Sequence, residues 1–176
     1  MTPARFAHDV RVMEEAVRIG KTEGADPDRC ALAGILHDVA REYTLEQYAA
    51  LGLTEQPGAN DPENAIYDHV LMHGMAAAKI GRETFGINDD EVLEAAAWHT
   101  TGRPDMTTLE KIIYLADYTE PNRDFEGVEP LRALTFESLD AAMALGLKMS
   151  LEEIRARGIE PFRDTIDAYE YFKDKQ

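Results

Sequence analysis

The sequence predicts an all-α fold in a single domain. Apolar residues recur at intervals of three and four along most of the chain, which is the spacing of a buried helical stripe. Residues that favour helix caps stand at the ends of these segments, and we find no convincing strand. A chain of 176 residues is long enough for one substantial core and short for two. We therefore expect one unit over residues 1–176.

The first two predicted helices carry the first polar residues of interest. One begins near Arg5, and His8 lies beside its apolar stripe, where it can point inward. Asp26–Pro27 then forms a helix start, an N-cap followed by proline at the first helical position, and the apolar run after it ends at His37–Asp38. The stripe that we expect to be buried in the first helix comprises Phe6, Val10, Met13 and Val17.

The middle of the chain alternates short helices with loops. Thr44–Gln47 has the spacing of a capping box, and Gly52 is a suitable end for that helix. Residues 57–62 are rich in Gly, Asn, Asp and Pro, which predicts a mobile loop. The next helix is expected from about residue 62 or 66 to residue 84, and small residues after His73 permit close packing.

The remaining helices complete the all-α body. Asn88 is expected to cap a helix that leads to His99, and Gly102 ends it close to that histidine. Thr107–Glu110 opens another helix, which is apolar up to Asp117. Two last helices are expected at about residues 135–149 and 161–172.

Composition excludes several kinds of partner. The 34 acidic and 18 basic residues give a formal charge of −16, whereas nucleic acids and anionic membranes require a basic patch, so we expect neither as a partner. A small phosphorylated substrate stays compatible, because bound cations reverse the field inside a pocket. Cys30 is the only cysteine and no apolar signal segment is evident, which predicts a cytoplasmic protein. No apolar stretch is long enough to span a bilayer.

Four histidines and two aspartates form the most informative pattern. His37–Asp38, His99 and Asp117 each stand where an otherwise core-like segment would carry apolar residues, and burying an unpaired carboxylate is costly unless a metal or hydrogen bonds satisfy it. Imidazole and carboxylate together suit a divalent first-row metal, so the set predicts a metal-dependent phosphohydrolase. A single His-Asp pair is weak evidence, and we interpret His8–Asp9 as a chance pair. The candidate ligands are His8, His37, Asp38, His73, His99 and Asp117.

This ordered set resembles the HD-domain phosphohydrolase superfamily, whose helices deliver such ligands to a metal. Two further histidines, here His73 and His99, mark its binuclear members. The closer resemblance is to the YqeK family of symmetrical diadenosine tetraphosphate (Ap4A) hydrolases. It covers core motifs at residues 5–140, and C-terminal helices are assigned to residues 141–176. The matching segments are Arg5 with His8, Gly34–Ala40, His73–Gly74 with Ala77, His99–Arg103, Lys111–Asp117 and Glu120–Arg123.

The resemblance implies a centre of two divalent metals, with iron as the first choice and Mn, Co, Ni or Zn as alternatives. Asp38 would bridge the two ions. A water shared by two cations loses a proton near neutral pH and attacks phosphorus in line, which would cleave Ap4A into two ADP. A homodimer is also compatible with the family. The implied ligands are His8, His37, Asp38 and Asp117 for one metal, and His73 and His99 for the other.

Catalytic roles are assigned to Asp38, His37 and Arg123, and further residues to the substrate. Arg123 is the preferred phosphate clamp, because a guanidinium binds phosphate oxygens in pairs. Thr100 and Thr101 can donate to a phosphate or orient His99. Arg103 and Lys111 are equally compatible with solvated surface charges, and Glu120 with a ribose contact or with holding Arg123. The substrate-binding candidates are therefore Arg103, Lys111, Thr100, Thr101, Glu120 and Arg123.

Two alternatives stay open at this stage. The chain can be a different HD nucleotidase, acting on a nucleoside mono- or triphosphate or on a signalling nucleotide. It can also be a non-catalytic HD regulatory module, although such a module would typically have lost ligands that are all present here. His69, four residues before His73, departs from the expected ligand set and is interpreted as a surface or loop-facing histidine.

Overall fold

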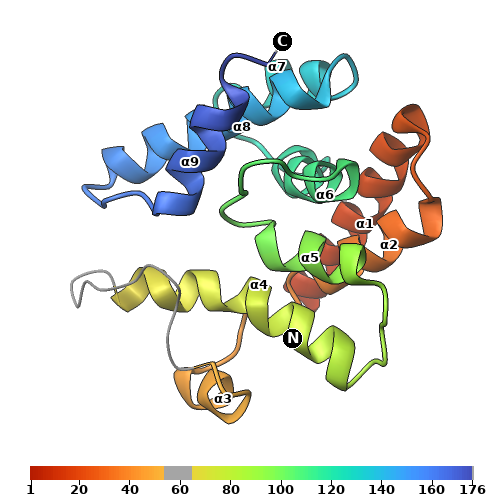
Figure 1. Ribbon diagram of the computed structural model, residues 1–176, viewed down its shortest axis with the longest axis vertical. Helices are drawn as coiled ribbons and strands as arrows, with labels where there is room; N and C mark the ends of the chain where they lie inside the picture. Colours follow the sequence, from red (N-terminus) through yellow and green to blue (C-terminus); the bar gives the residue numbers. More distant parts are fainter. Residues whose placement is uncertain (54–64, 176) are drawn as a thin grey trace.

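The described part of the protein is built from α-helices (Figure 1). The computed structural model describes the backbone of residues 1–53 and 65–175 and the side chains of residues 1–53 and 71–175. Within those ranges it has no strand, which confirms the all-α prediction. The predicted loop at 57–62 and the His69 side chain lie outside the described residues. The helices are α1 (Pro3–Glu23), α2 (Pro27–Leu36), α3 (Leu45–Ala50), α4 (Ala65–Glu83), α5 (Asp90–Trp98), α6 (Thr108–Thr119), α7 (Val128–Thr135), α8 (Leu139–Ala156) and α9 (Arg163–Phe172).

Side-chain caps fix several helix starts where the sequence predicts them. Asp26 accepts from the backbone N–H groups of the first turn of α2, and Pro27 occupies its first position. Capping boxes at Thr44 and Thr107 have both reciprocal hydrogen bonds, so α3 and α6 begin as expected. The predicted cap of α5 is wrong by one residue, because the Asp89 carboxylate, and not Asn88, accepts from the first turn.

The buried face of α1 differs from the apolar stripe expected from the sequence. Phe6 is 55% exposed, and Val10, Met13 and Val17 are only partly buried. The helix is turned so that polar residues join the face that packs on α2 and α6, which a count of apolar residues alone does not reveal. This face comprises His8, Asp9, Val12, Glu15, Ala16, Ile19 and Gly20.

The C-terminal part contains one helix that the sequence analysis missed. α7 spans eight residues, too few for a clear apolar period, and it begins after Gly127 (φ +91°) without a side-chain cap. The helix expected at 135–149 therefore starts later, at Leu139, and continues to Ala156. The last helix agrees with its predicted range, and α8 and α9 lie side by side in Figure 1.

A large apolar core joins α1, α2, α5, α6, α8 and α9. Ile112, Ile113 and Leu115 on α6 are fully buried at its centre. Each such side chain contributes roughly 1.5–3 kcal/mol of burial free energy, which helps to offset the cost of burying a polar cluster beside them. None of the described helices is long and apolar enough to cross a bilayer. A smaller cluster under α3 and α4 comprises Ala40, Tyr48, Met72, Ala76 and Ile80.

Two glycines let neighbouring helices approach closely beside the predicted ligands. A Cβ at Gly34 would lie 2.7 Å from Met13 Cα, and one at Gly74 would lie 2.5 Å from the Ala97 carbonyl oxygen. Both distances are too short for real atoms. Glycine at these positions therefore permits the α1–α2 and α4–α5 contacts that draw the histidines together.

Candidate metal centre

The structure brings all six predicted ligands to one place, where five helices converge. His8 lies on α1 and His73 on α4, whereas His37 and His99 are the residues that directly follow α2 and α5. Ligand atoms fall into three overlapping groups, in each of which they lie within 4.8 Å of one another. The groups are His8, Asp9, His37 and Asp38; His37, His99 and Asp117; and Asp38, His73 and His99.

Backbone carbonyls orient two of the imidazoles. His37 Nδ1 donates to the Gly34 carbonyl oxygen and His99 Nδ1 to the Ala96 carbonyl oxygen, each at 2.7 Å. Both acceptors lie three residues earlier, in the last turn of a helix, where carbonyls have lost their helical partners. Protonation at Nδ1 leaves the Nε2 lone pair of each ring available to a cation.

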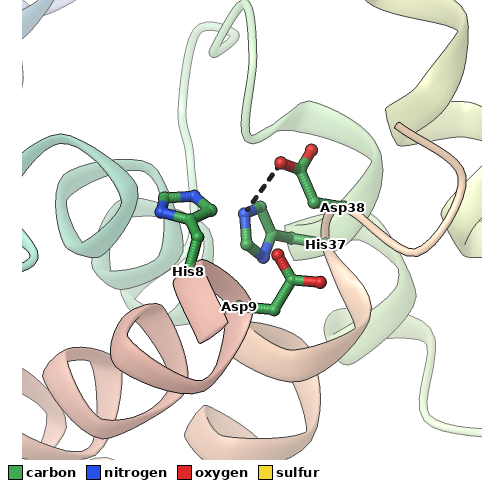
Figure 2. Close-up of side chains that lie close together, drawn as sticks. All are labelled: His8, Asp9, His37 and Asp38. Carbon is green, nitrogen blue, oxygen red and sulfur yellow. Dashed lines mark ion pairs between the residues drawn. The ribbon is translucent and has the colours of Figure 1, made fainter. Parts of the chain in front are cut away.

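Asp38 is the side chain that the histidines share. Its Oδ1 lies 3.0 Å from His73 Nε2 and 3.5 Å from His99 Nε2, while its Oδ2 lies 3.7 Å from His37 Nε2 and 2.6 Å from Arg5 Nη1. Figure 2 shows the contact between His37 and Asp38. Burial raises the pKa of Asp38, but the adjacent imidazoles of His73 and His99 outweigh that effect and hold the pKa well below its usual range. The two oxygens can therefore serve two sites.

Carboxylates flank His8 on both nitrogens. Nε2 lies 3.0 Å from Asp117 Oδ1, and Nδ1 lies 3.2 Å from Glu120 Oε1. Glu120 is itself fixed by Arg11 Nε at 2.7 Å. Burial lowers the pKa of His8, but the adjacent Asp117 carboxylate outweighs it, so the pKa is raised above 6.5. A carboxylate on the outer nitrogen of a histidine is the usual means of fixing a metal ligand.

His73 and His99 face each other directly. Their Nε2 atoms are 2.9 Å apart, and Thr100 Oγ1 lies 3.2 Å from each. Burial lowers the pKa of His73 to about 4, so this ring is neutral at pH 7. Two imidazole nitrogens that point at a common position suit a shared cation. On the outer side, Arg41 Nη1 lies 3.3 Å from His73 Nδ1.

Asp9 belongs to the same cluster, although the sequence analysis interpreted its pairing with His8 as chance. It is fully buried, and neither carboxylate oxygen has a hydrogen-bond partner in the described part of the chain. Figure 2 shows it beside the His37 ring, with Asp38 on the other side. Burial, and next the charge of Asp38, raise the pKa of Asp9 to about 7. Asp9 joins the cluster because it lies on the face of α1 that packs on α2. The sequence alone did not identify that face.

Unsatisfied buried atoms show that the residues fit a metal. Among the described residues, His8 Nε2, His37 Nε2, Asp38 Oδ1 and both oxygens of Asp9 make no hydrogen bond of ordinary geometry, although His8 Nε2 lies 3.0 Å from Asp117 Oδ1 and Asp38 Oδ1 lies 3.0 Å from His73 Nε2. Burying a neutral polar group without a hydrogen-bond partner costs roughly 2–7 kcal/mol, and burying an unpaired charge costs more. A divalent cation would satisfy several at once, and the mixture of imidazole and carboxylate is the donor set that first-row metals accept.

A cleft of about 1270 Å³ opens from the cluster, and cationic side chains line its near end. Arg123 donates through Nε to the Asp117 carbonyl oxygen at 2.7 Å and through Nη2 to the Asp117 carboxylate. Arg5 and Arg41, which were not among the predicted substrate contacts, also line the cleft. The sequence signal for them was present, because each stands three residues from a ligand, His8 or Asp38.

The other predicted substrate contacts divide into two groups. Thr100 and Thr101 line the cleft, and their role as phosphate donors stays a prediction. Lys111 instead pairs with Asp140 at 2.8 Å and Arg103 with Glu110 at 2.7 Å, and neither lines the cleft.

The Glu120 side chain contacts residues that the sequence analysis did not consider as its partners. The residue is 2% exposed and its side chain is bonded to His8 and Arg11, so it holds a candidate ligand, while its backbone carbonyl oxygen accepts from the Arg123 N–H at 2.9 Å.

Comparison with known proteins agrees with this geometry. The HD domain family model matches residues 5–122. The chain is 37% identical to the symmetrical bis(5'-nucleosyl)-tetraphosphatase of Halalkalibacterium halodurans, over 96% of this chain and 89% of that protein. It is 34% identical to the protein of the same name from Bacillus subtilis, over 97% and 90%. The structure is also similar to the crystal structure of a predicted HD superfamily hydrolase involved in NAD metabolism from Clostridium acetobutylicum, with a TM-score of 0.90 and 34% identity, covering 100% of this chain and 92% of that one.

Proposed function

This chain belongs to the HD-domain family, and we propose that it is a symmetrical bis(5'-nucleosyl)-tetraphosphatase that hydrolyses Ap4A to two ADP. The observation that carries the proposal is the convergence of all six expected ligands in a chain that is similar to two such enzymes over most of its length. Because both relatives are named symmetrical bis(5'-nucleosyl)-tetraphosphatases, Ap4A is favoured over another nucleotide as the substrate. A homodimer and a cytoplasmic location stay predictions.

We assign two divalent metal ions to the centre, with iron as the first choice. His8, His37, Asp38 and Asp117 would hold one ion, and His73, His99 and the second oxygen of Asp38 the other. When bound, the ions supply an acidified water as nucleophile and offset the charge that develops on the phosphate oxygens. The protein needs no nucleophilic side chain of its own.

The side chains around the ligands position the polyphosphate. Arg123 faces the cleft and is held by Asp117, so its guanidinium is fixed beside the metal ligands. Thr100 lies against His73 and His99, where its hydroxyl can donate to a phosphate oxygen. Arg5 and Arg41 add two positive charges at the same end of the cleft. This local positive charge opposes the repulsion that a net charge of −16 exerts on a polyanion.

The reaction consumes one water for each substrate. A new P–O bond forms from water to one of the two central phosphorus atoms, and the P–O bond to the other half of the molecule breaks. One ADP carries the oxygen of the attacking water, and the other departs with the former bridging oxygen. Arg123, close to Asp117, is placed to offset negative charge on the transferred group.

Product analysis tests this proposal. Protein purified anaerobically and loaded with iron or manganese is incubated with Ap4A, and the nucleotides are separated by anion-exchange chromatography. We expect ADP as the sole product. AMP with ATP would show attack at an outer phosphorus and overturn the assignment. Absence of turnover by metal-loaded protein would favour a different HD nucleotidase or a non-catalytic module.

A further inference from the structure

Asp9 is a buried acidic side chain that the proposed mechanism does not use. It is fully buried on the face of α1 that packs on α2 and α6. Neither of its carboxylate oxygens has a hydrogen-bond partner among the residues that the structure describes. A buried carboxylate without a partner is more costly than a neutral polar group, so it needs a compensating charge nearby.

The metal-ligand atoms that lie close to Asp9 belong to one side of the centre. An oxygen of Asp9 lies within 4.8 Å of ligand atoms of His8, His37 and Asp38. Figure 2 shows its carboxylate beside the His37 ring. The group of ligand atoms around His73 does not include Asp9. The charge of Asp9 would therefore act mainly on the ion assigned to the four ligands that include His8, which we call the first ion.

The charged side chains around Asp9 have other partners. Asp38 is itself a carboxylate, so it repels Asp9 when both are ionised. Arg5, four residues earlier on α1, acts on Asp9, but its Nη1 atom donates to Asp38 Oδ2 at 2.6 Å. The His8 ring lies between two other carboxylates. This arrangement of charges favours a bound divalent cation beside Asp9.

We propose that Asp9 is a charge-compensating carboxylate of the metal centre: its charge strengthens binding of the first ion, and the bound ion removes the cost of burying Asp9. The inference rests on the proposed function only for the presence of a metal centre, and it adds an acidic residue to the six assigned ligands. Because an ion that binds only the folded chain stabilises the fold, metal affinity and stability are linked. Removal of the Asp9 charge should strengthen one and weaken the other.

Mn²⁺ binding to metal-free protein tests this role without turnover. Asp9→Asn nearly preserves the shape of the side chain and removes its charge. Electron paramagnetic resonance of free Mn²⁺ during a titration would give the affinity for each ion. Thermal denaturation at pH 8 would give the stability of the metal-free protein.

Glu15→Gln is the matched control, because it removes the same charge from the same helix. Glu15 is 3% exposed on the buried face of α1, but its carboxylate pairs with Arg18 at 2.7 Å. It lies six residues after Asp9, roughly 9 Å farther along the helix axis. Any general effect of charge or packing on this helix face should appear in both variants.

We expect Asp9→Asn to weaken binding of the first ion by about 10–100-fold, the range typical of changes at residues behind metal ligands, and binding of the second ion by less. The Tm of the metal-free Asp9→Asn protein should rise. Glu15→Gln should leave both Mn²⁺ affinities nearly unchanged, since coupling between charges falls with distance, and should lower the Tm because Arg18 loses its partner.

Two results would overturn the role of Asp9. An unchanged Mn²⁺ affinity in Asp9→Asn would show that the carboxylate does not act on the first ion. A fall in both the Mn²⁺ affinity and the Tm of the metal-free protein would show that Asp9 only supports the packing of α1. Product analysis with Ap4A tests the reaction separately, so wild-type protein that releases only ADP would keep the proposed function even if Asp9 had no such role.

Discussion

The cluster has two halves that differ in charge although both contact Asp38. The His8 half, comprising His8, His37 and Asp117, adjoins the further carboxylates of Asp9 and Glu120, which outnumber the one guanidinium bound to Asp117, that of Arg123. The His73 half, comprising His73 and His99, adjoins Thr100 and the cationic Arg41. A cation is stabilised by nearby carboxylates and destabilised by a guanidinium. We therefore expect the His8 half to retain a metal more strongly than the His73 half.

The largest effect should come from the residue that both halves share. Asp38→Ala removes oxygens that contact His37, His73 and His99, so we expect loss of both metals and a fall in kcat of about 1000-fold or more. Metal analysis and Ap4A turnover measure this, with circular dichroism as the check on folding. Asp140→Ala, which removes a carboxylate paired with Lys111, is the control. Retained turnover would refute the role of Asp38.

Removing His73 should separate the halves. His73→Ala deletes one of the two histidines that face each other, so we expect the metal content to fall from two ions per chain to one and activity to be largely lost. Elemental analysis after desalting measures the stoichiometry. Loss of both ions from His73→Ala would mean that the halves bind metal only together, and the comparison would fail.

Glu120 offers a milder test on the other half. Glu120→Gln weakens the carboxylate contact with His8 Nδ1, and changes at such outer positions reduce metal affinity or activity by about 10–100-fold. Competition with a metal chelator would measure the affinity of the tighter ion. Glu110→Gln is the matched control, because Glu110 is also fully buried and paired with an arginine outside the cluster. Equal effects of the two changes would show a general loss of stability.

Proton competition should also reveal the asymmetry within the cluster. Burial lowers the pKa of His37 and His73 to about 4, whereas carboxylates outweigh burial and raise the pKa of His8 and His99 above 6.5. A metal must therefore displace protons from His8 and His99, whereas His37 and His73 are already neutral. Metal affinity should therefore fall as the pH falls from 8 to 6, as a titration at each pH would show. A constant affinity across that range would contradict the raised values.

The smallest expected effect is on the metal-free protein. The pKa of Asp9 is raised from 3.8 to about 7, so the proton-linked penalty for burying it is absent below about pH 4 and complete above about pH 7. Asp9→Asn removes that charge and should stabilise the metal-free protein at pH 8 by roughly 2 kcal/mol, with little gain at pH 4. Thermal denaturation at both pH values measures the difference. Destabilisation at pH 8 would show that the carboxylate has a partner.

Much of the fold follows from local signals, whereas the errors of the sequence prediction arise where those signals are weak or where tertiary packing decides. Capping residues such as Asp26, Thr44 and Thr107 bond to their own first turn, so neighbouring sequence is sufficient to place those helix starts. α7 was missed because it is short and lacks a side-chain cap. The buried face of α1 was misplaced because burial depends on what a helix packs against, and polar residues occupy part of that face.

The sequence by itself determined the all-α fold, the capped starts of several helices and the six candidate ligands, because periodicity, caps and misplaced polar residues are properties of single segments. Only the tertiary structure decided which further polar residues lie beside the six candidate ligands. Asp9 and Glu120 enter the cluster, while Lys111 and Arg103 pair elsewhere with Asp140 and Glu110. The reason is physical: charges of distant segments meet only after the helices pack, and the packing depends on close approaches such as those at Gly34 and Gly74.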